Sequence, residues 1–227
     1  MLKKTALVLI SMFCCQQSYA GGVSLGATRL VYPTSKDQVT LKIYNTDDKG
    51  NYLVQSWISD EKSEKVKDFI VTPPLFVIKS GNDNLLKVVY TGDKNNLPKD
   101  REKLFFLNAK VIPSLTEQEQ KIDNALLIST TTKIKVFIRP DSIKEDPFES
   151  YKLLTCSYEA GKIKVSNPTP FYMNLVSLSV NGKEVSDAET ISPMSSVYVN
   201  SNQKSNYLSF NFINDYGVQI KDRQCHL

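Results

Sequence analysis

Residues 121–140 read KIDNALLISTTTKIKVFIRP, and their alternating pattern is the most informative signal of the fold class. Its even-numbered positions from Ile122 to Ile138 carry mainly aliphatic or β-branched residues, whereas the odd positions include Lys135 and Arg139. Alternation with period two predicts a β-strand much longer than the usual ~5–6 residues. Two interpretations remain open here. The segment is either a long core strand of a β-sandwich or a strand whose edge pairs with another protein.

The first twenty residues have the features of a secretory signal. Lys3 and Lys4 give a positive start, the apolar run TALVLISMF follows, and Ser18 and Ala20 place small residues before the expected cleavage point. The apolar run is too short for a membrane span, which needs about 20 residues. We therefore expect residues 1–20 to be a signal peptide that directs export.

The cysteines are divided between this leader and the rest of the chain. Cys14 and Cys15 leave with the signal, so Cys156 and Cys225 are the two that remain. An isolated pair in an oxidising compartment predicts a disulfide, with two buried free thiols as the alternative. A lipoprotein signal acylated at a leader cysteine is a further alternative, but Phe13 stands where a small residue would be expected.

Length and charge limit the classes of protein that this chain can represent. The mature chain, 21–227, is long enough for one large β domain or for two of about 100 residues each. Without Lys3 and Lys4 it carries 26 basic and 24 acidic residues, a net charge of about +2. Such a balance argues against a strong nucleic-acid binder.

Strand-like runs bounded by turn residues recur as far as Pro140, and no stretch has convincing helical periodicity. About seven strands before Pro140 fit one immunoglobulin-like sandwich. The expected strands are residues 23–32, 39–44, 52–59, 69–72, 75–78, 85–90 and 103–111.

A second, smaller β unit is expected after a charged linker. Residues 141–147 read DSIKEDP and have no apolar pattern, so they form the expected linker to a unit at 148–227. Asn181 and Gly182 give a hairpin signal within that unit. Its expected strands are residues 153–157, 162–166, 171–180, 196–200, 207–213 and 218–225.

The sequence lacks the residues that common catalytic and metal sites need. His226 is the one histidine, and a chain end is a poor place for a preorganised base. Together with Cys156 and Cys225 it does not make a zinc set. No glycine-rich phosphate loop is present, and no pair of carboxylates stands out by its spacing. We therefore expect no catalysis, no metal and no cofactor.

Residues 97–113, LPKDREKLFFLNAKVIP, are the most specific stretch of the chain. They resemble the signature of the immunoglobulin-like periplasmic chaperones of the chaperone–usher pathway, with modest departures at Lys103 and Ala109. Other segments resemble this family in the same order, so that the resemblance covers essentially the whole mature chain. These segments are VSLGATR at 23–29, TKIKVFIRP at 132–140, NPTPFY at 167–172 and NDYG at 214–217.

The resemblance implies an all-β chain with two immunoglobulin-like domains, 21–140 and 148–227, set at an angle like a boomerang. It implies a periplasmic chaperone for pilus or fimbrial subunits, which lends a strand to each subunit and delivers it to an outer-membrane usher. The implied partners are the subunits and the usher, with no nucleic acid, small-molecule substrate or cofactor. Whether the free protein caps its own binding surface by dimerising is left open.

The resemblance also assigns charged residues to two sites. Arg29 and Lys135 match the cleft pair that holds the C-terminal carboxylate of a subunit, which two converging cations suit chemically. Glu102, Arg139 and Asp215 match the charges that join the two domains. Without the resemblance, all five would be ordinary surface charges of little energetic value.

A donor strand is the third site that the resemblance implies. Thr130 stands where the family commonly has a third large aliphatic residue, so this strand looks weaker at that end. The connection from Pro113 to Asn124 is short and lacks cysteine, which resembles the chaperones of rod-like pili rather than those of thin fibres. The expected donor residues are Ile122, Asn124, Leu126, Ile128 and Thr130.

Two other classes of function compete with this interpretation. One is a secreted adhesion or structural pilus subunit, which would carry a donor extension at its N-terminus and lack a strand. The segment after Ala20 is short, and the first unit has a full set of expected strands. The other is a glycosidase on a sandwich scaffold, which the lack of a placed carboxylate pair opposes.

Overall fold

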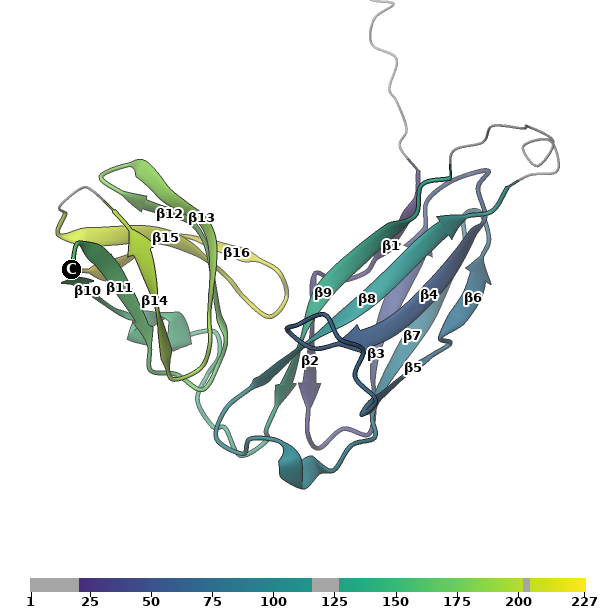
Figure 1. The fold of residues 1–227 in the computed structure, drawn as a ribbon, viewed down its shortest axis with the longest axis horizontal. Helices are drawn as coiled ribbons and strands as arrows, with labels where there is room; N and C mark the ends of the chain where they lie inside the picture. The colour runs from purple at the N-terminus through teal and green to yellow at the C-terminus, as the bar shows by residue number, and fades with distance from the viewer. Residues whose placement is uncertain (1–20, 116–126, 202–204) are drawn as a thin grey trace, which may run out of the picture.

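The structure is a computed structural model of the 227-residue chain, and it describes residues 21–115, 127–201 and 205–227. The expected signal at 1–20 lies outside these residues. Figure 1 shows two β-sandwiches set at an angle, which confirms the predicted fold class. The described residues contain no α-helix, so none of them forms a helix that could cross a membrane.

The first domain is built from nine described strands and one short 3-10 helix, η1 (Lys94–Asn96). The strands are β1 (Val23–Leu25), β2 (Arg29–Pro33), β3 (Val39–Asn45), β4 (Tyr52–Ser59), β5 (Phe69–Thr72), β6 (Leu75–Ile78), β7 (Asp83–Tyr90), β8 (Lys103–Pro113) and β9 (Thr130–Arg139). One sheet has the order β1-β3-β7-β5, and the other has the order β2-β9-β8-β4-β6. β8 therefore lies inside its sheet, as its two apolar faces predict.

The predicted single strand at 23–32 is wrong, because the chain changes sheets in the middle of it. β1 pairs antiparallel with β3, whereas β2 pairs parallel with β9. The break begins at Gly26, whose N–H donates to the carbonyl of Lys42 at 2.7 Å. A Cβ at Gly26 would stand 3.0 Å from the Tyr44 ring, so a side chain would crowd this turn. Alternation alone predicts extended backbone and cannot locate such a crossing.

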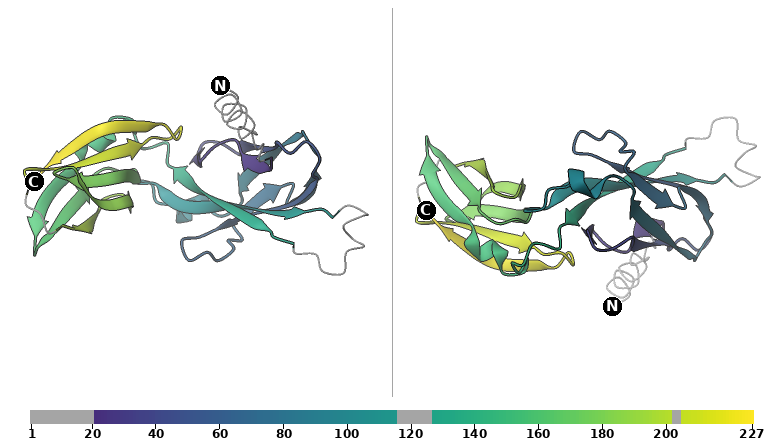
Figure 2. Two further views of the ribbon diagram at one scale, coloured as in Figure 1. Left: turned by 90° about the horizontal axis from the view of Figure 1, so that it is seen from above. Right: turned by 90° about the horizontal axis from the view of Figure 1, so that it is seen from below.

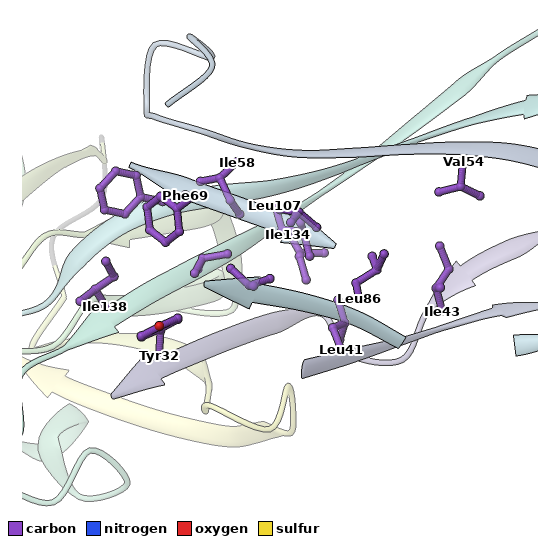
Figure 3. Packing of buried hydrophobic residues seen from close by; sticks show 14 of the residues in the cluster. Tyr32, Leu41, Ile43, Val54, Ile58, Phe69, Leu86, Leu107, Ile134 and Ile138 are labelled. Carbon is purple, nitrogen blue, oxygen red and sulfur yellow. The ribbon is translucent and has the colours of Figure 1, made fainter. Parts of the chain in front are cut away.

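The core of the first domain lies between the two sheets (Figure 3). Ile134, Val136 and Ile138 of β9 point into it and are fully or nearly fully buried. Leu107 of β8 and Leu86 of the facing sheet belong to the same cluster. The alternation seen in the sequence thus sets the core-facing side of β9 from Ile134 onward, and it leaves the odd residues on the outer face.

The second domain packs the sheet β10-β11-β14 against the sheet β13-β12-β15-β16. A 3-10 helix, η3 (Ser150–Leu153), precedes it. Its strands are β10 (Thr155–Glu159), β11 (Lys162–Asn167), β12 (Met173–Val180), β13 (Lys183–Ile191), β14 (Ser195–Asn200), β15 (Tyr207–Ile213) and β16 (Gln219–His226).

β13 is a strand that the sequence did not predict. Its residues, KEVSDAETI, are mostly polar and show no apolar run. The predicted hairpin signal at Asn181 and Gly182 is correct, since both residues have positive φ values of 50° and 75°. This turn brings β13 alongside the apolar strand β12, which supplies its backbone partners. β13 therefore owes its conformation to its neighbour rather than to its own composition.

A disulfide joins Cys156 in β10 to Cys225 in β16, the second domain's first and last strands. We expect replacement of both cysteines by serine to lower the free energy of unfolding by about 4 kcal/mol, because the bridge closes a loop of 69 residues in the unfolded chain. Urea denaturation of the oxidised protein and of the double variant measures this difference. Thiol labelling that finds two reactive cysteines in the native wild-type protein would contradict the bridge.

Candidate functional site

Two basic side chains lie next to each other where the first domain faces the second. β2 and β9 run parallel, and their register places Arg29 opposite Lys135. The following pair, Leu30 and Val136, faces the core, so the two cations lie on the outer face of the sheet. The yellow β15–β16 hairpin of the second domain points toward the first domain in both views of Figure 2.

Arg29 is almost fully buried at this junction, with 9% of its surface exposed. Its Nη1 donates to the carbonyl of Ile213 at the end of β15, at 3.0 Å. Its Nε is buried and has no hydrogen-bond partner among the described residues. Burial lowers the pKa of Arg29, and nearby Asp215 opposes this shift. A buried guanidinium with an unused N–H is suited to receive an anion.

Lys135 is half-buried beside it. Its Nζ donates to Oδ1 of Asn174 in β12 and to Oγ1 of Thr190 in β13. Burial lowers the pKa of Lys135 to about 8, and the positive charge of Arg29 acts in the same direction. Two adjacent, partly desolvated cations repel each other, and an anion placed between them would relieve that repulsion. The pair is therefore a candidate carboxylate site.

An ionic cluster joins the domains close to this pair. Arg139, the last residue of β9, donates from Nε to Glu102 at 2.7 Å and from Nη1 and Nη2 to Asp215 at 2.8 and 3.1 Å. Glu102 also accepts the backbone N–H of Tyr172 in the second domain at 2.8 Å. One guanidinium therefore links a first-domain carboxylate to a second-domain carboxylate.

The cluster is largely withdrawn from solvent. The side chains of Glu102, Arg139 and Asp215 are 1%, 18% and 22% exposed. Burial raises the pKa of Glu102 to about 7, while Arg139 and the Tyr172 N–H favour its ionised form. Such charges depend on one another, because removing one partner leaves the others buried and uncompensated.

The edge of β9 is only half covered. β2 pairs with Lys135–Arg139, and β8 pairs with Thr130–Ile138 on the other side. Among the described residues, no strand pairs with Thr130–Ile134 on the side opposite β8. That half of β9 offers backbone N–H and C=O groups that a strand from another chain can bind.

The expected donor residues are only partly described. Ile122, Asn124 and Leu126 lie outside the described residues. Ile128 is 65% exposed, and Thr130 is exposed at the start of β9. The predicted continuous strand does not extend through residues 127–129, because the pairing of β9 with β8 begins at Thr130 opposite Val111.

The sequence did not single out the second-domain residues that hold the two cations. Asn174, Thr190 and Ile213 bind Lys135 and Arg29. A polar Asn174 within the apolar run MNLVSLSV is a weak signal that could have marked one of them. Thr190 and the carbonyl of Ile213 carry no signal, since their roles come from the way the domains meet.

Two family models match the chain. The pili and flagellar-assembly chaperone PapD N-terminal domain matches residues 22–144, and the pili assembly chaperone PapD C-terminal domain matches residues 149–224. The probable fimbrial chaperone protein ElfD of Escherichia coli O157:H7 is 38% identical over 219 residues, covering 94% of this chain and 92% of that protein. The probable fimbrial chaperone SfmC of Escherichia coli K12 is 35% identical over 231 residues, covering 100% of both chains.

Solved structures of chaperones also match the chain. The periplasmic chaperone SfaE matches with a TM-score of 0.79 and 32% identity, covering 91% of this chain and 100% of that one. A structure of the Salmonella enterica SafA pilin in complex with the SafB chaperone matches with a TM-score of 0.81 and 31% identity, covering 92% of this chain and 98% of that one.

We expect Arg139→Ala to lower the free energy of unfolding by about 3 kcal/mol, because Glu102 would stay buried without its cation. Arg101→Ala is the matched control, since it removes an exposed ion pair with Asp100 and should cost below about 1 kcal/mol. Thermal unfolding measures stability, and small-angle scattering measures the angle between the domains. Equal effects of the two variants in both measurements would mean that the cluster does not set the geometry.

Proposed function

The chain belongs to the family of pilus-assembly chaperones that includes PapD, and we propose that it protects pilus subunits in the periplasm by lending them the free edge of β9. The observation that carries this proposal is the half-covered strand. An incomplete subunit exposes an apolar groove and unpaired strand edges, which cause aggregation. A strand added to that groove satisfies both the backbone groups and the apolar surface.

The faces of β9 explain how one strand serves two proteins. Its even residues are buried in the first domain's own core from Ile134 onward, whereas Thr130 and Thr132 on the same face are exposed. Ile128 continues this face beyond the described strand. A subunit bound here extends the sandwich and takes over the core side of the strand. Each aliphatic side chain that the subunit buries contributes about 1.5–3 kcal/mol.

The cation pair sets the register and direction of the bound strand. β2 begins opposite Lys135, so a strand along Thr130–Ile134 must end where β2 begins. A C-terminal carboxylate held by Arg29 and Lys135 therefore requires the subunit strand to run parallel to β9. Ile128 precedes Lys135 by about 23 Å of extended strand, which places donor side chains well inside a subunit groove.

Membership of the family supports the remaining parts of the proposal, which are the outer-membrane usher as a partner and the periplasm as the location. Export by the signal at 1–20 brings the protein to an oxidising compartment, where the disulfide between Cys156 and Cys225 is stable. Handover of the subunit to an outer-membrane usher completes the cycle. A role as a polymerising subunit has less support, because strands β1–β9 form two sheets around one continuous core.

Lys135→Ala and Arg29→Ala should each reduce recovery of a co-expressed pilus subunit by at least about tenfold, because each removes a charge-assisted bond to the carboxylate. Lys164→Ala is the matched control, since it removes a partly exposed second-domain lysine that bonds to Glu159 instead. The amount of subunit that co-purifies from the periplasm is measured together with circular dichroism of the chaperone. If both Lys135→Ala and Arg29→Ala recover as much subunit as the wild-type protein, the proposed binding of the subunit carboxylate by this pair is refuted.

Ile128→Asn should weaken the complex with a subunit by about tenfold, because one apolar side chain no longer enters the groove. Leu127→Asn should weaken it less, since the neighbouring residue on an extended strand faces the other way. The two changes are well matched, because both side chains are exposed in the free protein, at 65% and 44%. A pull-down in which Leu127→Asn has the equal or larger effect would rule out this register.

A further inference from the structure

The second domain contributes two oxygen atoms to the cation pair. Asn174 in β12 and Thr190 in β13 are directly opposite each other in the antiparallel pairing of these strands. Opposed residues on one face have Cβ atoms about 5 Å apart, close enough for both side chains to reach one atom. Here that atom is Nζ of Lys135, in the other domain. We call Asn174 and Thr190 the ammonium seat.

The seat leaves the ammonium group ready for one further acceptor. An ammonium has three N–H donors, and the seat takes two of them. Asn174 is 5% exposed, and its Nδ2 lies near the carbonyl of Tyr172, so its Oδ1 is the atom turned toward Lys135. The lysine side chain has four flexible bonds, and two fixed acceptors restrict them before any ligand arrives.

We propose that Asn174 and Thr190 are positioning residues that keep Lys135 charged and aim its third N–H at the carboxylate of a bound subunit. This inference rests on the proposed carboxylate anchor and adds the second domain to it. Arg29 is held in the same way by the carbonyl of Ile213, so each cation of the pair has a second-domain acceptor. The carboxylate site is therefore complete only while the two domains keep their relative position.

The surroundings of Lys135 allow a test that a purely structural role would not satisfy. Arg29 of β2 is the charged neighbour that acts on it. The groups that face it from β8, β12 and β13 are Phe106, Asn174 and Thr190, none of which is charged. Removing a seat oxygen takes away an interaction with the charged form, so the Lys135 titration midpoint should fall below that of the wild-type protein.

The test uses the full mature protein and four variants, Asn174→Ala, Thr190→Val, Asn174→Asp and Lys135→Ala. Nuclear magnetic resonance follows the titration of Lys135. Calorimetry from pH 6 to 9 measures binding of a hexapeptide of alternating threonine and valine with a free C-terminal carboxylate, and of the same peptide as an amide. Asn200→Ala and Thr155→Val, on exposed positions of the other sheet, are the matched controls.

We expect Asn174→Ala and Thr190→Val to lower the Lys135 midpoint and to weaken carboxylate binding at pH 7 by about tenfold. Asn174→Asp should raise the midpoint yet also weaken binding, because its own carboxylate competes for the ammonium. Binding of the peptide amide should not change in these variants. Both control variants should keep the wild-type Lys135 midpoint and the wild-type affinity for the carboxylate. If Asn174→Ala does not fold, Thr190→Val decides the outcome.

The experiment distinguishes failure of the positioning role of Asn174 and Thr190 from failure of the carboxylate site at Lys135. The positioning role of Asn174 and Thr190 is refuted if Lys135→Ala loses carboxylate binding while Asn174→Ala or Thr190→Val keeps the wild-type affinity and the wild-type Lys135 midpoint. The carboxylate site itself is refuted if Lys135→Ala binds both the free-acid peptide and the peptide amide as the wild-type protein does. The positioning role of Asn174 and Thr190 is then refuted as well.

Discussion

Half of one edge of β9 is left uncovered, and the short pairing with β2 is the reason. β2 can pair with only five residues of β9, because the chain changes sheets at Gly26 and β2 begins at Arg29. The uncovered half is a permanent strand edge, which most proteins avoid. Its basic and polar residues, such as Lys133 and three successive threonines, disfavour aggregation at this edge.

In the proposed mechanism, the cation pair and the ionic cluster convert that edge into a selective site. Arg29 and Lys135 lie where the free edge ends, so we propose that they favour a strand that finishes there with a carboxylate. Arg139, four residues further along β9, fixes the second domain through Asp215. Under this proposal, a single strand provides the binding edge, one anchor and the link between domains, which would couple binding to domain position.

Patterns within the sequence predicted the strands, and contacts between distant segments decided the rest. Alternation identified β8 and β9, and the turn residues identified the hairpin at Asn181. The pattern could not show that residues 23–32 divide between two sheets, or that the polar segment of β13 becomes a strand beside β12. Resemblance to a family named Arg29, Lys135, Glu102, Arg139 and Asp215, whereas Asn174 and Thr190 emerged only from the way the domains meet.

Amide hydrogen exchange at single-residue resolution, in the free chaperone and in its complex with a captured subunit, tests whether a subunit binds to the free edge of β9. We expect the amides of Thr130–Ile134 that do not bond to β8 to exchange rapidly in the free protein and to become protected in the complex. The amides of Lys135–Arg139, already covered by β2, should change little. Protection confined to another sheet edge, such as β6 or β13, with Thr130–Ile134 unchanged, would contradict the proposed use of β9.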